Sequence, residues 1–349
     1  MKDLKSFNFQ GKRVLVRCDF NVPLDEEGVI LDDFRIRKTI PTIEYLLKEK
    51  GRVILMSHMG RPLQSSKFKV QSSKFSLKTV AGRLSELLNR GVGFSEDCVG
   101  EEVEEKVSRM EEGDILLLEN LRFHKDEENN NEEFSRSLSH LADIYINDAF
   151  SVCHRSHASV VGITKYLPSG AGLLLEKEIE ILSKIMENPE KPLGLIIAGT
   201  KAEDKVKVIE KFLDIADFFL LGDSTTEEVR KRKIKDDSGK IIFPKDSLGG
   251  LDIGPLAREV FREKILSAKT IFWAGPLGKI DQEKYQAGTR EVIKAILDSK
   301  CFSVAGGGDT IEFINKLGVA DKFGHISIGG SAMLAFLAGE KLPGLEVLQ

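Results

Sequence analysis

Continuous apolar runs rich in Val, Ile and Leu recur along the chain, and segments with helical spacing of apolar residues separate them. Runs that stay apolar at successive positions are typical of strands buried on both faces of a parallel sheet. Such strands alternating with amphipathic helices predict an α/β fold. The predicted strands lie in RVLVRCDF, RVILMSH, DILLLEN, DIYINDAF, PLGLIIAG, ADFFLLGD, TIFWAGP, CFSVAGGG and GHISIGG.

The predicted strands form two groups, one on each side of LLLEKEIEILSKIMENPEKP, which predicts a helix with a Pro-containing exit. We therefore expect two doubly wound parallel-sheet domains joined by a helix. The expected bounds are 1–170 for the first domain, 171–190 for the helix, 191–330 for the second domain, and 331–349 for a C-terminal helix and tail returning to the first domain.

Two local patterns give finer predictions. In SLKTVAGRLSELLNRG, the leucines and Val80 share one helical face, with Ser76 as the N-cap and Gly91 as the stop. The near-copies QSSKFKV and QSSKFSL, within residues 64–77, predict a duplicated surface loop.

Composition narrows the classes of function. The 349 residues, 41% hydrophobic and 30% charged, suffice for two cores. The net charge of −4 argues against a nucleic-acid binder, which must neutralise phosphates. No apolar run approaches the ~18 residues of a membrane span, so we expect a cytoplasmic protein. The scattered cysteines contain no CxxC pair, which predicts buried free thiols rather than a zinc site or disulfides: Cys18, Cys98, Cys153 and Cys301.

Polar residues that follow the strands of the first group indicate an anion site. Ligands bind beyond the carboxyl ends of strands in open parallel sheets, and arginine forks match carboxylates and phosphates. A single arginine of this kind is more often a solvated surface charge, but surface charges have no reason to follow strand ends. The residues are Asp19, Asn21, Arg35, His58, Arg61, Arg122, His124, His154, Arg155 and His157.

The second group indicates a phosphate site. Lys201 and Lys205 follow one strand, four residues apart, and the glycines of AGGGDT, residues 305–310, precede a helix whose N-terminus attracts phosphate. Asp309 is either the N-cap of that helix or a ligand of phosphate-bound Mg²⁺. Neither GxxxxGK[ST] nor a GxGxxG after the first strand is present, which argues against a P-loop NTPase and a simple dinucleotide dehydrogenase.

Eight ordered segments resemble motifs of the phosphoglycerate kinase family, and the resemblance runs from near Gly11 to GEKLPGL. The segments are RVLVRCDFNVP, DDFRIRKTIPTI, ILMSHMGRP, LLLENLRFH, YINDAFSVCHRSHAS, GLDIGP, GGGDT and DKFGHIS.

The resemblance implies two Rossmann-like domains and transfer of a phosphoryl group between 1,3-bisphosphoglycerate and ADP, giving 3-phosphoglycerate and ATP. It implies Mg²⁺ as cofactor, carried by Asp309, with Arg35, Lys201 and Gly330 as catalytic residues and a monomeric chain. The acid substrate would be held by Asp19, Asn21, Arg35, His58, Arg61, Arg122 and Arg155. The nucleotide would be held by Lys201, Lys205, Asp281, Gly306, Gly307, Gly308, Asp309 and Thr310.

The chain departs from the family pattern mainly in the second domain. After FFLLG, several tens of residues that help to wall the adenosine pocket in the family are absent, and DSTTEEVRKRKIKDDSGKIIFPKDS stands there. In this segment we expect a capping box of Ser224 and Glu227, a short helix, and KIIF as an edge strand. Single replacements are Ala274 for Asn, Asp281 for Glu, Ala198 for Gly, Ile328 for Thr, and Ser331 and Ser151 for Gly.

Two functions are therefore open. The first is a working phosphoglycerate kinase with a reduced base pocket, which predicts that GDP is a tolerable substitute for ADP. The second is a non-catalytic or weakly active phosphoglycerate-binding relative.

Overall fold

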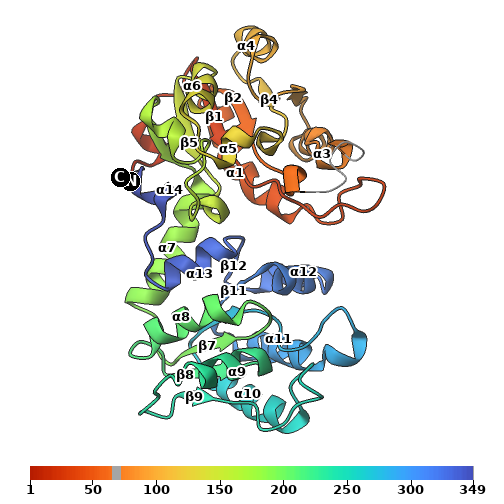
Figure 1. Ribbon diagram of the computed structural model, residues 1–349, viewed down its shortest axis with the longest axis vertical. Coiled ribbons are helices and arrows are strands. Elements are labelled where there is room, and N and C mark those ends of the chain that lie inside the picture. The colour runs from red at the N-terminus through yellow and green to blue at the C-terminus, as the bar shows by residue number, and fades with distance from the viewer. Residues whose placement is uncertain (65–71, 349) are drawn as a thin grey trace. The chain divides into compact units, whose positions relative to one another are not determined.

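The computed structural model describes residues 1–64 and 72–348. The chain divides into two compact units, Met1–Lys177 with Lys341–Gln349, and Glu178–Glu340. Each unit holds a six-stranded sheet in which all strand pairs are parallel (Figure 1), which confirms the predicted α/β class. The division falls within helix α7 (Leu173–Glu187), and residues 331–340 belong to the second unit. The predicted duplicated loop lies largely outside the described residues.

The sheet of the first unit is doubly wound. Its strand order is β3-β4-β2-β1-β5-β6, so β2, β3 and β4 lie on one side of β1, with β4 between β3 and β2, and β5 and β6 lie on the other side. The switch point of the topology, where ligands of such sheets bind, lies between β1 and β5. The strands are β1 (Arg13–Arg17), β2 (Arg52–Met56), β3 (Gly93–Phe94), β4 (Ile115–Leu117), β5 (Ile144–Asn147) and β6 (Ser169–Ala171).

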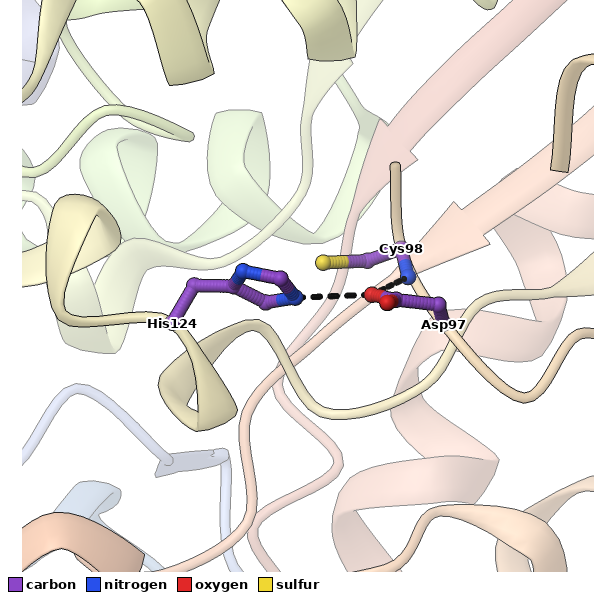
Figure 2. A group of neighbouring side chains, drawn as sticks. All are labelled: Asp97, Cys98 and His124. Carbon is purple, nitrogen blue, oxygen red and sulfur yellow. Dashed lines mark hydrogen bonds and ion pairs between the residues drawn. The ribbon is translucent and has the colours of Figure 1, made fainter. Parts of the chain in front are cut away.

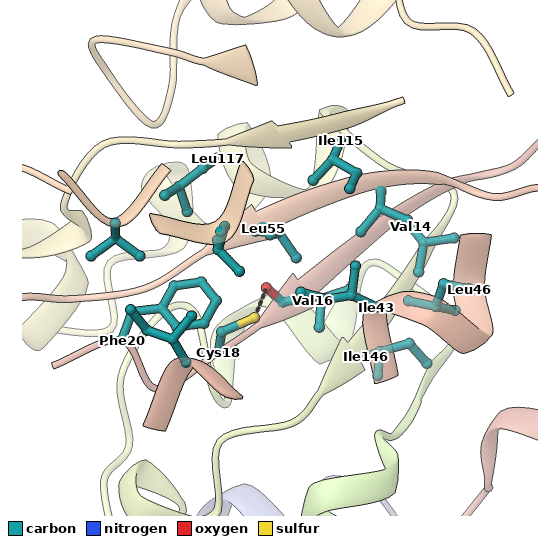
Figure 3. Packing of buried hydrophobic residues seen from close by; sticks show 14 of the residues in the cluster. Val14, Val16, Cys18, Phe20, Ile43, Leu46, Leu55, Ile115, Leu117 and Ile146 are labelled. Atoms are coloured by element: carbon teal, nitrogen blue, oxygen red, sulfur yellow. Dashed lines mark hydrogen bonds between the residues drawn. The ribbon is translucent and has the colours of Figure 1, made fainter. Parts of the chain in front are cut away.

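Burial explains the continuous apolar runs. Val14, Leu15 and Val16 are consecutive in β1, and all three are fully buried because helices or loops cover both faces of the sheet. On one face, Val14 and Val16 pack in a cluster with Ile43 and Leu46 of helix α1 (Phe34–Lys48), as Figure 3 shows. This core fixes the direction in which the carboxyl end of β1 points.

Short helices fill the remaining connections of the first unit. The α-helices besides α1 and α7 are α3 (Lys78–Leu88), α4 (Glu101–Ser108), α5 (Lys125–Glu128), α6 (Glu132–His140) and α14 (Pro343–Glu346). The 3₁₀ turns are η1 (Leu4–Ser6), η2 (Pro62–Gln64), η3 (Ser72–Phe75), η4 (Leu121–Phe123), η5 (Phe150–Val152) and η6 (Gly162–Lys165).

The predicted caps of α3 were wrong. The N-cap is Leu77 and not Ser76, whose hydroxyl donates to the Glu119 carboxylate at 2.6 Å and accepts the Lys78 backbone N–H at 3.2 Å. The same carboxylate accepts the backbone N–H of Leu77, the residue before the helix, at 2.8 Å. The helix ends at Asn89 in the left-handed conformation, two residues before the predicted stop at Gly91. Tertiary contacts with Glu119 therefore supplement the local contact of Ser76 at the helix start.

The sheet of the second unit repeats the doubly wound design. Its order is β12-β11-β10-β7-β8-β9, which places the switch point between β7 and β10. The strands are β7 (Leu193–Ile197), β8 (Phe218–Leu221), β9 (Ile241–Ile242), β10 (Thr270–Ala274), β11 (Phe302–Gly306) and β12 (His325–Ser327). The helices are α8 (Ala202–Phe212), α9 (Asp223–Lys231), α10 (Pro255–Ser267), α11 (Ala287–Ser299), α12 (Gly308–Lys316), α13 (Ser331–Leu337), and the 3₁₀ turns η7 (Glu283–Tyr285) and η8 (Ala320–Lys322).

The segment after β8 is ordered as a helix and a strand. The predicted edge strand is confirmed, since β9 pairs with β8 at the sheet edge. The predicted capping box was wrong, because α9 begins at Asp223 and its N-cap is Gly222, without a side-chain cap. Ser224 lies inside the first turn, where its hydroxyl donates to the Gly199 carbonyl at 2.7 Å.

Two further features concern the whole chain. None of the described helices combines the length and apolarity that crossing a membrane requires. All four cysteines are free thiols; three are buried as predicted, whereas Cys301 is only partly covered. The C-terminal segment contacts the first unit, where the Gly344 backbone N–H donates to the Cys153 carbonyl at 2.9 Å.

Candidate active site

The carboxyl end of β1 organises the first group of polar residues. Asp19 is buried directly after the strand; its carboxylate forms an ion pair with Arg35 and accepts the Ser151 hydroxyl at 2.6 Å. The Asn21 side chain accepts the backbone N–H of Gly60 at 2.8 Å, which ties the turn after β1 to the turn after β2. The structure therefore brings together Asp19, Asn21 and Arg35, which the sequence predicted as neighbours.

Arg122 is the most confined cation of this group. Its side chain is 4% exposed, with Nη1 donating to the Gly60 carbonyl at 2.7 Å and Nε lying 3.3 Å from the Glu128 carboxylate. Nη2 has no hydrogen-bond partner among the described residues. Burial and the charges of Arg155 and Arg17 lower the pKa of Arg122 to about 10. A buried guanidinium with an unpartnered N–H suits an anionic ligand, which would compensate its charge.

Arg17 is a further buried cation beside these residues, and the sequence analysis missed it. It is fully buried as the last residue of β1; its Nη2 donates to Nδ1 of His58 at 3.1 Å, and its Nε donates to the Ser159 hydroxyl at 2.9 Å. Burial and nearby arginines hold the pKa of His58 well below its usual value. His58 is therefore neutral with its proton on Nε2, where it can donate to a ligand. An arginine inside an otherwise apolar run was the available signal.

A buried carboxylate, Glu127, balances Arg17. It accepts the Ser159 hydroxyl at 2.6 Å and lies 3.6 Å from Nδ1 of His157. Although burial opposes ionisation, the hydrogen bonding of His157 and Ser159 and the charge of Arg17 lower the pKa of Glu127. The carboxylate is therefore charged at neutral pH. Glu127 escaped prediction because nothing in KDEEN distinguishes a buried acid from the exposed acids beside it.

The remaining predicted residues add positive charge. The Arg155 side chain donates from Nε to the His154 ring at 3.2 Å, and burial together with the charge of Arg61 lowers the pKa of Arg155. Burial and Arg155 lower the pKa of His154 to about 4, so this ring is neutral. Clustered basic side chains that lower one another's pKa values are typical of a site that binds a multiply charged anion.

The second unit contains a cavity of about 630 Å³ beyond the ends of β7 and β10. Asp281 and Asp309, both predicted for the nucleotide, contribute carboxylates to its wall. The other predicted nucleotide residues are not part of this wall. The lining residues are Gly199, Thr200, Asp223, Ser224, Gly250, Leu251, Pro276, Leu277, Gly278, Lys279, Ile280, Asp281, Gln286, Asp309, Glu312, Phe313 and Lys316.

Lys205 lies at the switch point beside this cavity. Its side chain is 7% exposed, and Nζ donates to the Ala198 carbonyl and to the Thr200 carbonyl, the latter at 2.8 Å. Burial lowers the pKa of Lys205 to about 8; Lys201 adds to this effect and Asp309 opposes it. The turn after β10 approaches so closely that a Cβ at Gly275, where φ is +95°, would lie 2.6 Å from Nζ. Only glycine fits there.

The glycine-rich turn after β11 starts helix α12. Gly306 ends the strand, Gly307 is the N-cap with φ of +98°, and Gly308 and Asp309 open the helix. Asp309 is thus not the N-cap, one of its two predicted roles. Thr310 is structural in part, because its hydroxyl accepts the Gly275 N–H at 3.1 Å. Asp309 is exposed at the cavity wall, and a carboxylate so placed fits Mg²⁺, which prefers oxygen ligands and is commonly bound by few carboxylates plus substrate phosphates.

The two predicted catalytic residues of the second unit begin helices. Lys201 is the N-cap of α8, in the left-handed conformation with φ of 57° and its side chain exposed. Gly330 is the N-cap of α13, with φ of 54° and ψ of −120°. Helix N-termini present backbone N–H groups, so both positions favour phosphate oxygens.

An arginine-rich anion site on one doubly wound unit, and a cavity with a buried lysine and a glycine-rich helix start on the other, are features of a phosphoryl-transfer enzyme. Comparison with known proteins identifies the class. The phosphoglycerate kinase family model matches residues 4–228 and 222–340. The chain therefore belongs to the phosphoglycerate kinase family.

Individual relatives agree over the full chain. The phosphoglycerate kinase of Dictyoglomus turgidum is 45% identical over 395 residues, covering 99% of this chain and 98% of the relative. That of Coprothermobacter proteolyticus is 40% identical, covering 100% and 98%. The crystal structure of phosphoglycerate kinase from Pyrococcus horikoshii OT3 is similar with a TM-score of 0.88 at 34% identity, covering 100% of this chain and 98% of that one.

Proposed function

We propose that this chain catalyses reversible phosphoryl transfer between 1,3-bisphosphoglycerate and ADP, giving 3-phosphoglycerate and ATP. Two observations together carry the proposal: the chain belongs to the phosphoglycerate kinase family, and it buries cationic side chains in both units. Arg17, Arg122 and Arg155 lie buried or half-buried in the first unit, and Lys205 lies buried in the second. Arg122 has an Nη2 without a partner among the described residues, and burying such a charge destabilises a protein unless a ligand pairs with it.

The proposed roles of individual residues follow their positions. The acid substrate contacts Asp19, Asn21, Arg35, His58, Arg61, Arg122 and Arg155. The nucleotide contacts Lys201, Lys205, Asp281, Gly306, Gly307, Gly308, Asp309 and Thr310, and Asp309 holds Mg²⁺. Arg35, Lys201 and Gly330 act on the phosphoryl group in flight.

Positioning and charge neutralisation account for the chemistry. In-line transfer spreads negative charge over the equatorial oxygens of the phosphoryl group, so cations and backbone N–H groups stabilise the transition state without an acid–base pair. The Lys201 ammonium and the N–H groups that follow Gly330 supply this stabilisation. When bound, Mg²⁺ at Asp309 neutralises charge on the nucleotide phosphates. The neutral His58 donates its Nε2 proton to the acid substrate as a hydrogen bond, without transferring it.

We further propose that the second domain is a shortened form of the family's nucleotide domain. The alignment to the Dictyoglomus turgidum relative runs over 395 positions against the 349 residues of this chain. The family model also matches in two parts that meet at residues 222–228, where α9 starts. Both observations support a deletion in this segment, which favours weak selection of the base. The proposed deletion is also the reason to test the alternative function, a phosphoglycerate-binding relative without catalytic activity.

The decisive experiment is a coupled assay of the full chain with Mg²⁺, ADP and 1,3-bisphosphoglycerate. We expect ATP at a rate that depends on both substrates. If calorimetry detects 3-phosphoglycerate binding while no ATP forms at saturating Mg²⁺ and ADP, the chain is a phosphoglycerate-binding relative without activity.

Lys201→Ala tests the assignment of the transferring residue. Lys201 is exposed, so its removal leaves the fold intact, but transition-state charge loses one cation. We expect kcat to fall by about 10²–10³, as for other electrostatic groups of this kind. Calorimetric affinity for 3-phosphoglycerate should stay constant, as it should in the control Lys300→Ala. A Lys201→Ala enzyme with unchanged kcat would refute the role.

A further inference from the structure

A third group of chemistry-bearing side chains lies in the first unit and includes His124, which the sequence placed among the anion-site residues. Asp97 and Cys98 follow strand β3, and His124 joins turn η4 to helix α5. One potential ligand atom from each of the three lies within 4.8 Å of the others (Figure 2). In residues 1–64 and 72–348, this is the one group of at least three His, Cys, Asp or Glu side chains with such convergence.

Contacts around the group hold its members in place. Nε2 of His124 lies 2.7 Å from the Asp97 carboxylate, which also accepts the Cys98 backbone N–H at 2.6 Å. The imidazole packs against the Phe134 ring, with 5.2 Å between centroids. The Cys98 sulfur is buried and turned toward the imidazole, whereas the Asp97 side chain is 54% exposed. The group thus has a protein wall and one side open to water.

We propose that Cys98 Sγ, His124 Nε2 and an Asp97 carboxylate oxygen bind a zinc-class divalent cation, with water in the fourth position. Thiolate, imidazole and carboxylate are the ligands that Zn²⁺ takes in proteins, and three protein ligands with one open position is a recurrent arrangement. Mg²⁺ prefers oxygen ligands, so this site and the proposed Mg²⁺ ligand Asp309 select different metals.

The local geometry requires only side-chain adjustment. Bonds of about 2.0–2.3 Å in a tetrahedral site separate ligand atoms by roughly 3.3–3.8 Å. The His124–Asp97 contact, at 2.7 Å, therefore opens slightly, and the ligand atoms that lie up to 4.8 Å apart move closer by about 1 Å through small side-chain rotations. On binding, the cation displaces the proton of the Cys98 thiol to water. The thiolate and the Asp97 carboxylate then balance the two charges of the metal.

Occupancy of the site has a structural consequence for the first unit. Residues 121–124 form a single turn that carries both Arg122 and His124, and the Asn120 side chain caps it by accepting the Arg122 N–H at 3.0 Å. A cation bound to His124 ties this turn to the loop after β3. We therefore expect the metal to stabilise the turn that carries Arg122.

Cobalt(II) is the probe that tests the proposal, because tetrahedral cobalt–thiolate sites give a charge-transfer band and intense visible bands. The full chain is titrated with Co²⁺ in a phosphine reductant and saturating Mg²⁺. We expect about one Co²⁺ per chain with a thiolate band, displaced by Zn²⁺. The band should vanish in Cys98→Ser. In His124→Gln, the affinity of the protein for Co²⁺ should fall at least tenfold.

Matched controls separate this site from other thiols and imidazoles. Cys301→Ser and the exposed His140→Gln should keep the wild-type spectrum. Circular dichroism shows whether each variant is folded. If Cys98→Ser does not fold, the surface variants His124→Gln and Asp97→Asn test the proposed metal site in its place. Absence of a thiolate band in the wild type, or its survival in a folded Cys98→Ser or in Asp97→Asn and His124→Gln together, overturns the proposal.

Discussion

At the scale of single residues, the first unit concentrates buried positive charge. Arg17 has a charge partner in Glu127 through Ser159, whereas Arg122 has only Glu128 at 3.3 Å and an Nη2 without a partner among the described residues. Its lowered pKa, about 10, expresses the unfavourable free energy of this position. An anionic substrate that pairs with Nη2 would relieve it.

Arg122→Ala should therefore weaken substrate binding more than it weakens the fold. A charge-assisted hydrogen bond contributes about 1.5–3 kcal/mol, so we expect the Kd of 3-phosphoglycerate to rise about 10- to 100-fold. Calorimetry without nucleotide measures it. The control is Arg109→Ala, which removes an exposed arginine paired only with Glu105. Equal affinities in the two variants would contradict the role of Arg122.

Lys205 predicts a pH dependence for the nucleotide side. Its pKa of about 8 is below the usual value for lysine, so its ammonium is charged below pH 8 and loses its proton above it. Phosphates bind the charged form, so the affinity for Mg-ADP should be constant below the pKa. Above it, affinity should fall up to about tenfold per pH unit. Calorimetry from pH 7 to 9.5 would show this. Lys205→Met should bind weakly with a flat profile, and a flat wild-type profile would contradict the assignment.

At the scale of elements, the turns after β7 and β10 approach each other at the switch point. A Cβ at Gly275 would lie 1.9 Å from the Ala198 carbonyl oxygen, and the Trp273 indole N–H donates to the Gly275 carbonyl at 2.7 Å. The stretch TIFWAGPLG therefore contains the end of strand β10 and the turn that packs against the side chain of Lys205. Its conformation depends on one glycine.

Gly275→Ala tests this close approach against a matched glycine. Gly249 also has positive φ, at 64°, but has nothing within 4 Å of its Cβ position. Both substitutions carry the cost of positive φ, about 1 kcal/mol. Gly275→Ala should lose about 1–3 kcal/mol or more beyond that, because backbone must move. Urea unfolding followed by the fluorescence of Trp273, the only tryptophan, measures the difference. Equal losses would show that the turns are not tightly packed.

The same scale explains what the sequence could predict. The apolar runs located β1, β2, β4, β5, β7, β8, β10, β11 and β12, because burial of both sheet faces leaves a local signal. The short strands β3 and β6 contain Gly93–Phe94 and Ser169–Ala171, which have no such run and exist only through pairing with neighbours. The predicted caps of α3 and α9 failed for a related reason, since Glu119 accepts the Leu77 N–H and the Ser224 hydroxyl donates to the Gly199 carbonyl, both contacts between segments distant in sequence.

The candidate sites divide in the same way. Asp19, His58 and Arg122 were predictable because they follow strands whose ends meet at one edge of the sheet. Arg17 and Glu127 were not, because one is inside a strand and the other inside an acidic helix. Cys98 and His124 are 26 positions apart without metal-binding spacing, so only the fold reveals their proximity to Asp97.

At the scale of the whole molecule, each unit carries one half of the proposed reaction at its own switch point. The first unit contains all the residues proposed above for the acid substrate. The second contains the residues proposed for the nucleotide phosphates and, by the proposal above, a shortened segment after β8. The polar side chains that residues 222–250 place on the cavity wall are already engaged: Ser224 donates to the Gly199 carbonyl, and Asp223 accepts the Ser247 hydroxyl at 2.7 Å.

This asymmetry predicts weak selection of the nucleotide base. Strong discrimination, by 10⁴ or more, requires buried polar groups dedicated to the hydrogen-bonding edge of a ligand, whereas apolar and stacking contacts give roughly 10- to 200-fold. We expect kcat/KM with GDP to be within about tenfold of that with ADP, a difference of about 1.4 kcal/mol. The measurement is the coupled assay at fixed Mg²⁺ and 1,3-bisphosphoglycerate across nucleoside diphosphates.

Because both reactions share the first unit, the Michaelis constant for the acyl phosphate substrate should be the same with either nucleotide. An ADP preference above about a thousandfold would mean that residues outside 222–250 read the base.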